Sequence, residues 1–527
     1  MQNSEPVRSD QRFRVVGIGA SAGGLEALLE LFGALPANTG IAFAVVQHLE
    51  PHHESQLAVI LSRATQMPVV QAQEGQSLER DHVYVIPPNV VMVVEQGVLH
   101  LAPRPTSARP HYPIDTFLES LAADKGPDAI GIVLSGSASD GAQGIRVIKA
   151  AGGTTFSQDE RSAKYGGMPH SAIATGAIDF ILPPQGIARE LVKVDSHPFL
   201  TAPLQQLEEP VEGSEENGDL AAILERLKVA TQVDFTAYKL STIRRRVGRR
   251  LVVNHLGTLR EYRDYLDAHP GEVHELYRDI LISVTSFFRE PLMYEALSKV
   301  MLEYLMTRND EGAFRIWVPG CATGEEAYSL AMVALEICKK SGKDYPLQIF
   351  GTDISESAIE RARSGTYTEK VAADIPEERL ERFFTRVDSG FRIKREVRDC
   401  CIFALHDLTS DPPFSQMDMV SCRNVFIYLS AALQQRVLPA LHYSLKPSGL
   451  LVLGSAETVG NRLDLFGIAN HEHKIYSKRP GPAGLTMDLR QSVCRSDRRL
   501  KVLRRAFCVV VDKSYHAVCR SKQHRQV

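Results

Sequence analysis

The chain has 527 residues, 44% of them hydrophobic, which is enough for about two to four domains with cores of their own. Its formal net charge is only −3, which argues against nonspecific nucleic-acid binding by the whole chain. All eight cysteines lie at or after Cys321 without a CxxC pair, so we expect no disulfide framework or zinc ribbon, and a reducing, cytoplasmic setting. No apolar run approaches the roughly 20 residues that span a bilayer, and the N-terminus lacks an apolar signal segment.

From Arg14 to about Pro184, short β-branched runs alternate with amphipathic helical patterns. This alternation predicts a parallel α/β domain with helices on both faces of its sheet. In such domains, reactive side chains collect at the carboxyl ends of the strands. The predicted strands are RVVGIG, IAFAVVQH, VYVIPP, VVMVV, AIGIVLSG, TTFSQ and IDFILP.

Three of these strand ends carry the residue types of a serine hydrolase. Ser21 lies in a GxSxG turn after the first strand, His48 follows the second, and Asp140 follows AIGIVL. A serine hydroxyl is a weak nucleophile until a base takes its proton, and an imidazole base needs a carboxylate that fixes its tautomer. The turn would also aim helix N–H groups at a developing oxyanion. We therefore interpret the three residues as a catalytic triad.

Each residue alone also has a structural explanation, since a serine in a glycine turn is often a helix cap and Asp-Gly is common in turns. A dinucleotide site is the rival for GIGASAGG, but the second strand would then end in an acid, and it ends in Gln47 and His48. A metal cluster of His48, His52, His53 and Glu54 is a further alternative. Their spacing does not match a helical HExxH, so we expect no metal.

The motifs GIGASAGGLEAL, VVQHL, GIVLSGSASDGA and YGGMPHSA resemble, in this order, the CheB-type catalytic domain of chemotaxis protein-glutamate methylesterases. The resemblance covers residues 13–190 and implies that Ser21 is the nucleophile, His48 the base and Asp140 the orienting acid. Ala22 stands where a threonine is often found. Because Ser21 lies near the start of the chain, the receiver domain that usually precedes this domain is not expected, nor is phosphorylation in cis as its switch.

An acidic linker is predicted at residues 191–219, where the apolar period is lost and six acidic residues occur between His197 and Asp219 without a basic one. Residues 220–290 have a helical pattern and are locally basic. Their apolar positions Leu240, Ile243, Val247 and Leu251 recur at helical spacing, which predicts one packed face and one strongly positive face. That positive face could be solvated, bind nucleic acid or bind an acidic protein helix; without interleaved aromatic residues, nucleic acid is disfavoured. The basic residues are Lys239, Arg244, Arg245, Arg246, Arg249 and Arg250.

A second α/β pattern begins at Arg315, with strands RIWVPG, LQIFGTDIS, MDMVSCRNVFIY and GLLVLG, and it ends with HKIYSK. The stretch GCATGEEAYSL after its first strand is a glycine-bracketed turn that opens a helix. Gly320 and Gly324 let the backbone approach a ligand, and Glu325 and Glu326 favour a cationic cofactor over a phosphate. Asp353 ends the second strand, where a ribose-binding carboxylate belongs. The turn is not GxGxxG, so NAD is the less expected occupant.

The motifs SFFRE, GCATGEEAYSL, GTDIS and CRNVFIYL together resemble the CheR-type chemotaxis receptor methyltransferases over residues 220–480. This resemblance implies S-adenosylmethionine as cofactor, a helical domain at 220–290 whose basic helix is used against receptor helices, and a methyltransferase domain at 291–480. Arg289 and Tyr428 would face the reacting carboxylate, and Ser283 stands where an asparagine is common. The cofactor site would be lined by Thr285, Arg289, Glu326, Asp353, Asp407, Leu408, Asn424 and Val425.

The methyl-transfer chemistry suits such a site. A carboxylate is a competent nucleophile at neutral pH, so alignment with the methyl donor supplies most of the catalysis and no general base is required. Arg289 would hold the carboxylate through two hydrogen bonds. A buried structural role for Tyr428 is the alternative, since aromatic residues after a strand usually belong to a core.

The sequence thus predicts two doubly wound α/β domains, a parallel-sheet methylesterase and a Rossmann-like methyltransferase, with a small all-helical domain between them. We expect a chain that methylates glutamate side chains of a receptor-like or other signalling protein and hydrolyses the esters, with glutamine deamidation as a side activity of the same serine. The alternatives are a signalling scaffold that has lost one activity and a nucleic-acid methyltransferase. Residues 481–527 form a basic tail, either an arm or the start of a further domain. The substrate protein, the gate between the activities and the oligomeric state are not predicted.

Overall fold

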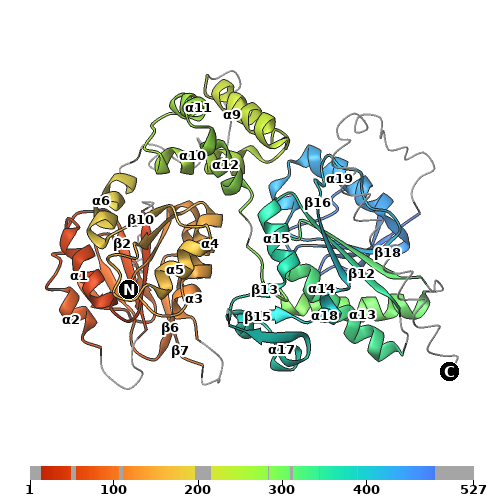
Figure 1. Cartoon of the computed structure of the whole chain (residues 1–527), viewed down its shortest axis with the longest axis horizontal. Helices are drawn as coiled ribbons and strands as arrows, with labels where there is room; N and C mark the ends of the chain where they lie inside the picture. Colours follow the sequence, from red (N-terminus) through yellow and green to blue (C-terminus); the bar gives the residue numbers. More distant parts are fainter. Residues whose placement is uncertain are drawn as a thin grey trace, which may run out of the picture. The chain divides into compact units, whose positions relative to one another are not determined.

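The structure is a computed structural model that describes residues 13–48, 55–105, 111–195, 197, 215–282, 284–308, 312–342, 345–388 and 390–480. It divides into two compact units, Met1–Val284 and Thr285–Val527 (Figure 1). Within the described ranges, no helix is both long and apolar enough to cross a membrane. Ser283, the metal candidates His52, His53 and Glu54, and the basic tail 481–527 lie outside the described residues.

A parallel sheet of seven strands forms the centre of the first unit, in the order β10-β9-β8-β1-β2-β5-β3. The predicted parallel α/β architecture is therefore confirmed. Strands β8, β1 and β2 are neighbours, so their carboxyl ends meet at one edge of the sheet. The strands are β1 (Val15–Ala20), β2 (Ala42–Gln47), β3 (Val69–Gln71), β5 (Val83–Val85), β8 (Ala129–Val133), β9 (Thr154–Gln158) and β10 (Phe180–Leu182).

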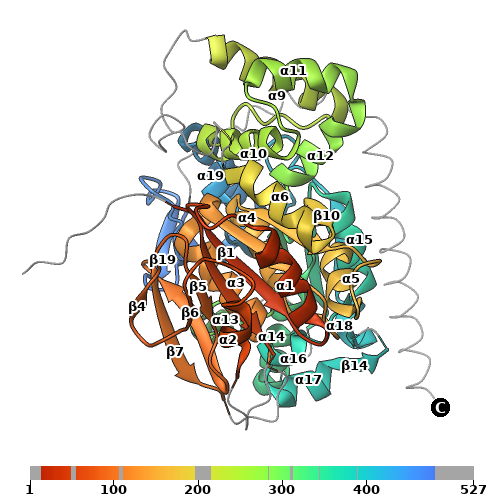
Figure 2. The same ribbon diagram turned by 90° about the vertical axis from the view of Figure 1, so that its left-hand side faces the viewer.

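Helices cover both faces of this sheet. Alternate residues of β1 point to opposite faces, so Val16 and Ile18 pack in one core with α1 and α6, while Val15 packs in a second core with α3 and α4. Figure 2 shows α1 and α6 on the near side of the strands. The helices are α1 (Gly24–Ala34), α2 (Leu57–Leu61), α3 (Pro113–Lys125), the 3-10 turn η1 (Gly126–Asp128), α4 (Ala142–Ala151), α5 (Gly167–Ala174) and α6 (Pro184–Asp195).

The run VVMVV does form a strand, β6 (Val90–Glu95), but its expected place in the parallel sheet is wrong. It pairs with β7 (Val98–Pro103) in a separate antiparallel sheet, ordered β4-β7-β6, to which β4 (Gln76–Ser77) also belongs. The reason is the two-residue turn between β6 and β7. Gln96 and Gly97 both have positive φ, 51° and 75°, which is the geometry of a tight hairpin turn.

Four helices complete the first unit and confirm the helical pattern: α9 (Glu215–Thr231), α10 (Leu240–Val253), α11 (Leu259–Ala268) and α12 (Pro270–Ile280). Because α6 continues to Asp195 and α9 begins at Glu215, the stretch between these helices is shorter than the predicted linker 191–219.

The predicted positive outer face of α10 is wrong. Ile243, Val247 and Leu251 are buried as expected, but most of the arginines are buried too. They bind carboxylates and backbone carbonyls inside the first unit, which explains how charged side chains are accommodated there. The buried arginines are Arg244, Arg246, Arg249 and Arg250.

The second unit contains a seven-stranded sheet in the order β16-β12-β11-β17-β18-β20-β19. The first five strands run parallel to one another. Strand β20 is antiparallel to β18, and β19 is antiparallel to β20. The predicted strands are present, whereas β16 and β19 were not predicted. The strands are β11 (Phe314–Pro319), β12 (Leu347–Asp353), β16 (Cys401–Leu405), β17 (Met417–Cys422), β18 (Leu445–Leu453), β19 (Phe466–Asn470) and β20 (Ile475–Lys478).

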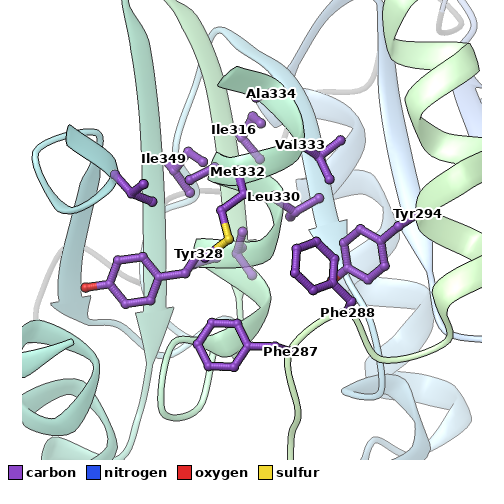
Figure 3. Close-up of a cluster of buried hydrophobic side chains, with 14 of the residues drawn as sticks. Phe287, Phe288, Tyr294, Ile316, Tyr328, Leu330, Met332, Val333, Ala334 and Ile349 are labelled. Carbon is purple, nitrogen blue, oxygen red and sulfur yellow. The ribbon is translucent and has the colours of Figure 1, made fainter. Parts of the chain in front are cut away.

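The main core of the second unit lies where α13 and α14 pack against this sheet, as the close-up in Figure 3 shows. A small antiparallel sheet, ordered β13-β15-β14, stands beside it and was not predicted. Its strands are β13 (Thr366–Tyr367), β14 (Phe384–Val387) and β15 (Gly390–Ile393). The helices are α13 (Pro291–Thr307), α14 (Glu325–Ser341), α15 (Glu356–Ser364), α16 (Val371–Asp374), α17 (Glu377–Phe383), α18 (Arg395–Arg398), the 3-10 turn η2 (Phe426–Tyr428) and α19 (Ala431–Ser444).

Candidate active sites

Ser21, His48 and Asp140 lie together at the carboxyl edge of the first sheet. Ser21 Oγ is 3.4 Å from His48 Nδ1, and His48 Nε2 is 2.7 Å from Asp140 Oδ2. With its proton on Nε2, the imidazole donates to the carboxylate, and Nδ1 is left to accept the serine proton. The geometry is therefore that of a nucleophile, a base and a carboxylate in series.

Asp140 is held rigidly because it is almost fully buried, with 1% of its surface exposed. Its Oδ1 accepts the backbone N–H groups of Asp115 and Gly141, each at 2.9 Å, and its Oδ2 accepts that of Ile114 at 3.0 Å. Backbone donors to both oxygens stabilise the charged carboxylate and fix its orientation. It is thus positioned to keep the histidine in a single tautomer.

Ser135 and Gln158 fix the nucleophile turn, and the sequence analysis missed both. The Ser135 carbonyl accepts the N–H of Ser21 at 3.0 Å, and the Ser135 hydroxyl donates to the carbonyl of Ala22 at 3.0 Å. Gln158 Oε1 accepts the N–H of Ser135 at 2.8 Å. Gln158 ends strand β9, and a polar residue that is 2% exposed at a strand end was the available signal.

Gly136 lies directly against the nucleophile, so we expect Gly136→Ala to lower ester hydrolysis strongly. A Cβ at this position would lie 2.9 Å from Ser21 Cβ and 2.1 Å from Met168 Sδ, so the serine turn would have to shift. Crowding of this kind costs about 1–3 kcal/mol of stability, whereas misplacing the nucleophile by about 1 Å costs about a hundredfold in rate. Gly166→Ala is the matched control, because a Cβ there meets nothing within 4 Å. Equal hydrolysis rates in the two variants would contradict this placement.

The glycine-bracketed turn of the second unit also has the expected form. Gly320, Ala322 and Gly324 have positive φ values of 70°, 48° and 96°. Strands β11 and β12 are neighbours, which brings Asp353 at the end of β12 to the turn: its Oδ2 accepts the N–H of Ala322 at 2.9 Å. Its Oδ1 accepts the N–H of Ser355 at 2.9 Å, and burial raises the pKa of this carboxyl above its usual range.

The residues around this turn fit a nucleoside that carries a positive charge. A Cβ at Gly320 would lie 2.5 Å from Val425 Cγ2, so only glycine lets the turn pack this closely against Val425. Glu326 lies in the first turn of α14, with an exposed fraction of 13%. Its carboxylate accepts the Ser421 hydroxyl at 2.6 Å, and burial raises its pKa. Glu325 is different: it is buried and accepts the Thr323 hydroxyl at 2.8 and 2.6 Å, so it serves the turn itself.

The SFFRE segment is anchored by its two phenylalanines. Phe287 and Phe288 are buried in the core with α14 (Figure 3), and the N–H of Phe288 donates to Ser329 Oγ at 3.0 Å. The anchored segment places Arg289 beside the cofactor turn, where its positive charge lowers the pKa of Glu326 against the larger effect of burial. The carbonyl of Arg289 also accepts a hydrogen bond from Arg423 at 3.0 Å. Thr285, at the start of the segment, is half-buried.

Asp407 follows strand β16 and closes a turn. Its Oδ1 accepts the N–H and hydroxyl of Thr409 at 2.8 and 2.7 Å, and its Oδ2 accepts the Ser410 hydroxyl at 2.9 Å. Leu408 is half-buried in the same turn. β16 adjoins β12, so this turn stands at the same sheet edge as Asp353.

The segment from Asn424 to Tyr428 follows β17 on the other side of β11. Asn424 has a positive φ of 58°, which is uncommon for a residue with a side chain. Tyr428 is half-buried, not part of the core, and this leaves it accessible from solvent. The structure thus gathers Glu326, Asp353 and the two segments that follow β16 and β17 at one edge. Among the described residues, no group of three or more His, Cys, Asp or Glu side chains could hold a metal ion.

Glu457 organises this segment, and the sequence analysis missed it. It is 4% exposed; its Oε2 accepts the N–H groups of Asn424 at 2.9 Å and Gly454 at 2.7 Å, and its Oε1 accepts those of Phe426 at 2.7 Å and Ile427 at 3.3 Å. One carboxylate therefore holds the turn that carries both a predicted cofactor residue and Tyr428. The signal was an acidic residue in an apolar run just after a strand, GLLVLGSAE.

We expect Glu457→Gln to weaken cofactor binding. A glutamine places an NH₂ group against backbone N–H donors, and a buried donor without an acceptor costs about 1–3 kcal/mol. Calorimetric titration with S-adenosylmethionine should show a higher Kd, and the melting temperature should fall. Glu472→Gln, at an exposed position, is the control. A Kd equal to that of the control would show that Glu457 does not position the segment.

Comparisons with known proteins agree with both sites. Three family models match in order: CheB methylesterase at residues 16–191, the all-alpha domain of CheR methyltransferase at 218–281, and its SAM binding domain at 283–475. Chemotaxis protein methyltransferase 1 of Pseudomonas aeruginosa is 34% identical over 37% of this chain and 74% of its own length. The chain belongs to the CheR methyltransferase family and carries a CheB methylesterase domain. The CheR model supports S-adenosylmethionine as the cofactor.

Two further relatives match different shares of this chain. A 104.1 kDa protein from the hypE 3′ region of Rhodobacter capsulatus is 38% identical over 82% of this chain and 47% of its own length. The chain thus spans about half of that relative. A protein of Anaeromyxobacter dehalogenans named protein-glutamate methylesterase/protein-glutamine glutaminase 2 is 36% identical over 36% of this chain and 55% of its own length.

Proposed function

We propose that this chain methylates glutamate side chains of a receptor-like signalling protein with S-adenosylmethionine and hydrolyses the resulting methyl esters. Two separate sites support the proposal, one in the CheB domain and one in the CheR domains. The observation that carries it is the alignment of Ser21, His48 and Asp140 in a chain that also holds a cofactor turn with Asp353 at its edge. Opposing chemistries in one chain fit a reversible methylation mark.

In the proposed ester hydrolysis, Ser21 Oγ attacks the ester carbonyl while His48 Nδ1 takes its proton. The charge that develops on the carbonyl oxygen is stabilised by backbone N–H groups of the turn before α1, with that of Ala22 placed next to the nucleophile. His48 then returns the proton to the leaving methanol. A water molecule, activated by the same histidine, hydrolyses the acyl-enzyme and releases the glutamate.

In the proposed methyl transfer, S-adenosylmethionine supplies an electrophilic methyl group. Asp353 binds the ribose hydroxyls, and Glu326 with the Asn424–Val425 segment lines the rest of the cofactor site. Asp407 and Leu408 line it from the neighbouring turn, together with Thr285. Arg289 holds the substrate carboxylate through paired hydrogen bonds, and Tyr428 orients it from the opposite segment. No proton has to be removed from the carboxylate, so the residues act by alignment.

The test uses the whole chain, methyl-labelled S-adenosylmethionine and helical fragments of candidate receptors. Base-labile label in the protein fraction measures methyl transfer, and labelled methanol measures hydrolysis. Label in RNA instead of protein would favour a nucleic-acid methyltransferase. Neither product, with the fragments folded, would favour a scaffold without catalysis.

Glutamine deamidation by Ser21 is a second proposed activity, because hydrolysis of an ester and of a primary amide pass through the same acyl-enzyme. The name of the Anaeromyxobacter relative, which includes a glutaminase, supports it. Ammonia release from a receptor fragment with glutamine at the methylation site measures it. We place methyl transfer, ester hydrolysis and deamidation in the cytoplasm, where the receptor substrate would present its glutamates.

A further inference from the structure

The arginine face of α10, formed by Arg245, Arg246 and Arg249, is turned toward the CheB domain within the first unit. Arg246 donates from Nη1 to the carbonyl of Lys149 at 2.6 Å and from Nη2 to the carbonyl of Ala150 at 2.5 Å. These carbonyls lie in the last turn of α4, where the helix dipole places partial negative charge. A cation is therefore well placed there.

Arg249 occupies the centre of a buried ion cluster. Its guanidinium binds Asp179, which precedes β10 in the CheB domain, and Asp279 of α12, while its Nε donates to the carbonyl of Gly153 at 3.0 Å. Lys149 Nζ lies 3.3 Å from Asp179 Oδ1 and 3.2 Å from Asp279 Oδ1. Two cations thus face two carboxylates, with side chains that are 0 to 7% exposed, and the charges balance.

The charge of the Asp179 carboxylate is needed for this balance. Burial alone would raise its pKa, but the charges of Arg249 and Lys149 outweigh burial and lower its pKa to about 2. Thr155 adds its hydroxyl, 2.8 Å from Asp179 Oδ2. Asp179 therefore stays ionised and serves as a carboxylate that the CheB domain offers to α10.

The two backbones approach closely at Gly152, beside the cluster. Gly152 has a φ of +94°, and a Cβ there would lie 2.8 Å from Arg245 Cδ. On its other side, α10 is held within its own domain by Arg250, which binds both oxygens of Glu272 at 2.7 Å. The CheB domain thus occupies the arginine face without being needed to hold α10 in the helical domain.

We propose that the CheB domain occupies the arginine face of α10 and thereby competes with an acidic protein helix for the same arginines. The inference rests on the proposed function, because a substrate rich in glutamate is an acidic partner. In this structure the arginine face binds the carboxylate of Asp179 and the carbonyl groups at the end of α4. A protein helix rich in glutamate presents groups of the same two kinds. Methyl transfer then requires release of α10 from Asp179 and α4.

The test measures binding of a fluorescent, glutamate-rich helical peptide to the full chain at fixed ionic strength. Asp179→Ala removes the CheB carboxylate and leaves every arginine of α10 intact, so the peptide should bind about tenfold more tightly, within the range of ordinary coupling between sites. Glu272→Ala is the matched control: it removes a buried carboxylate that binds Arg250 within the helical domain and leaves the contacts of Asp179 with Arg249 and Lys149 in place. It should bind the peptide like the wild type.

A second pair of variants avoids an unpaired buried charge. Gly152→Asn keeps a residue that tolerates positive φ and places a side chain against Arg245, so it should give the same gain. Gly176→Asn, with φ +69° and no neighbour within 4 Å of a Cβ, is its control. Circular dichroism and ester hydrolysis report whether each variant is folded.

Two results would overturn the inference: unchanged peptide affinity in folded Gly152→Asn, or an equal gain in Asp179→Ala and Glu272→Ala, which would indicate general loosening. Peptide binding needs neither cofactor nor methyl transfer. Failure of the proposed function would therefore appear as an absence of methylated product, whereas failure of this inference would appear as unchanged affinity.

Discussion

Replacing Ser21 by alanine should stop enzymatic methanol release from a methylated receptor fragment, with a fall in kcat of about 10⁴-fold or more. The alanine leaves His48 without a hydroxyl to deprotonate, so no acyl-enzyme forms. The cofactor site lies in a separate unit, so methyl transfer should continue. With labelled S-adenosylmethionine present, base-labile ester should therefore accumulate above the wild-type level.

The controls for this prediction separate the nucleophile from its orienting acid. Asp140→Asn keeps the serine but removes the charge that stabilises the protonated imidazole, and a loss of about 10⁴-fold in kcat is expected. Ser62→Ala changes an exposed serine away from the triad and should hydrolyse the ester at the wild-type rate. Methanol release that persists unchanged in Ser21→Ala would rule out the triad.

The triad could be predicted because it depends on a local rule applied three times. Ser21, His48 and Asp140 each follow a buried strand, and parallel strands bring their carboxyl ends to one edge. Asp353 could be predicted in the same way, from its place at the end of β12. What the pattern could not supply is the support around these residues. Glu457 binds the turn at Asn424 from the loop after β18, and no periodicity in the sequence links the two residues.

The arginines of α10 show a different limit of the sequence. Helical periodicity correctly placed Ile243, Val247 and Leu251 on a buried face, but it was wrong for Leu240, which is 38% exposed at the start of α10. It gave no information about the opposite face, because the partners of Arg246 and Arg249 lie in α4 and before β10, remote in sequence. A run of basic residues without acids indicates missing counter-charges, and here they come from elsewhere in the fold. The hairpin at Gln96 and Gly97 was also missed, although a glycine between two runs rich in valine is a turn signal.

Replacing Asp353 by alanine should raise the Kd for S-adenosylmethionine about 10- to 100-fold, which calorimetric titration would measure. A hydrogen bond to a charged group contributes about 1.5–3 kcal/mol, and the ribose would lose its acceptor. The variant also frees the N–H groups of Ala322 and Ser355, which loosens the glycine turn. Tyr428→Phe should leave this Kd unchanged while lowering the rate of methyl transfer, because in the proposed arrangement Tyr428 would face the substrate carboxylate and not the cofactor.

The pH dependence of cofactor binding tests the same assignment without loss of the side chain. Burial raises the pKa of Asp353, so on acidification its carboxylate takes up a proton at a higher pH than an ordinary aspartate does. The protonated form accepts hydrogen bonds poorly, so the wild-type Kd should rise as the pH falls through this raised pKa. Asp353→Asn cannot be protonated in this range and should lose that part of the pH dependence. Identical pH profiles for the two proteins would show that another group binds the ribose.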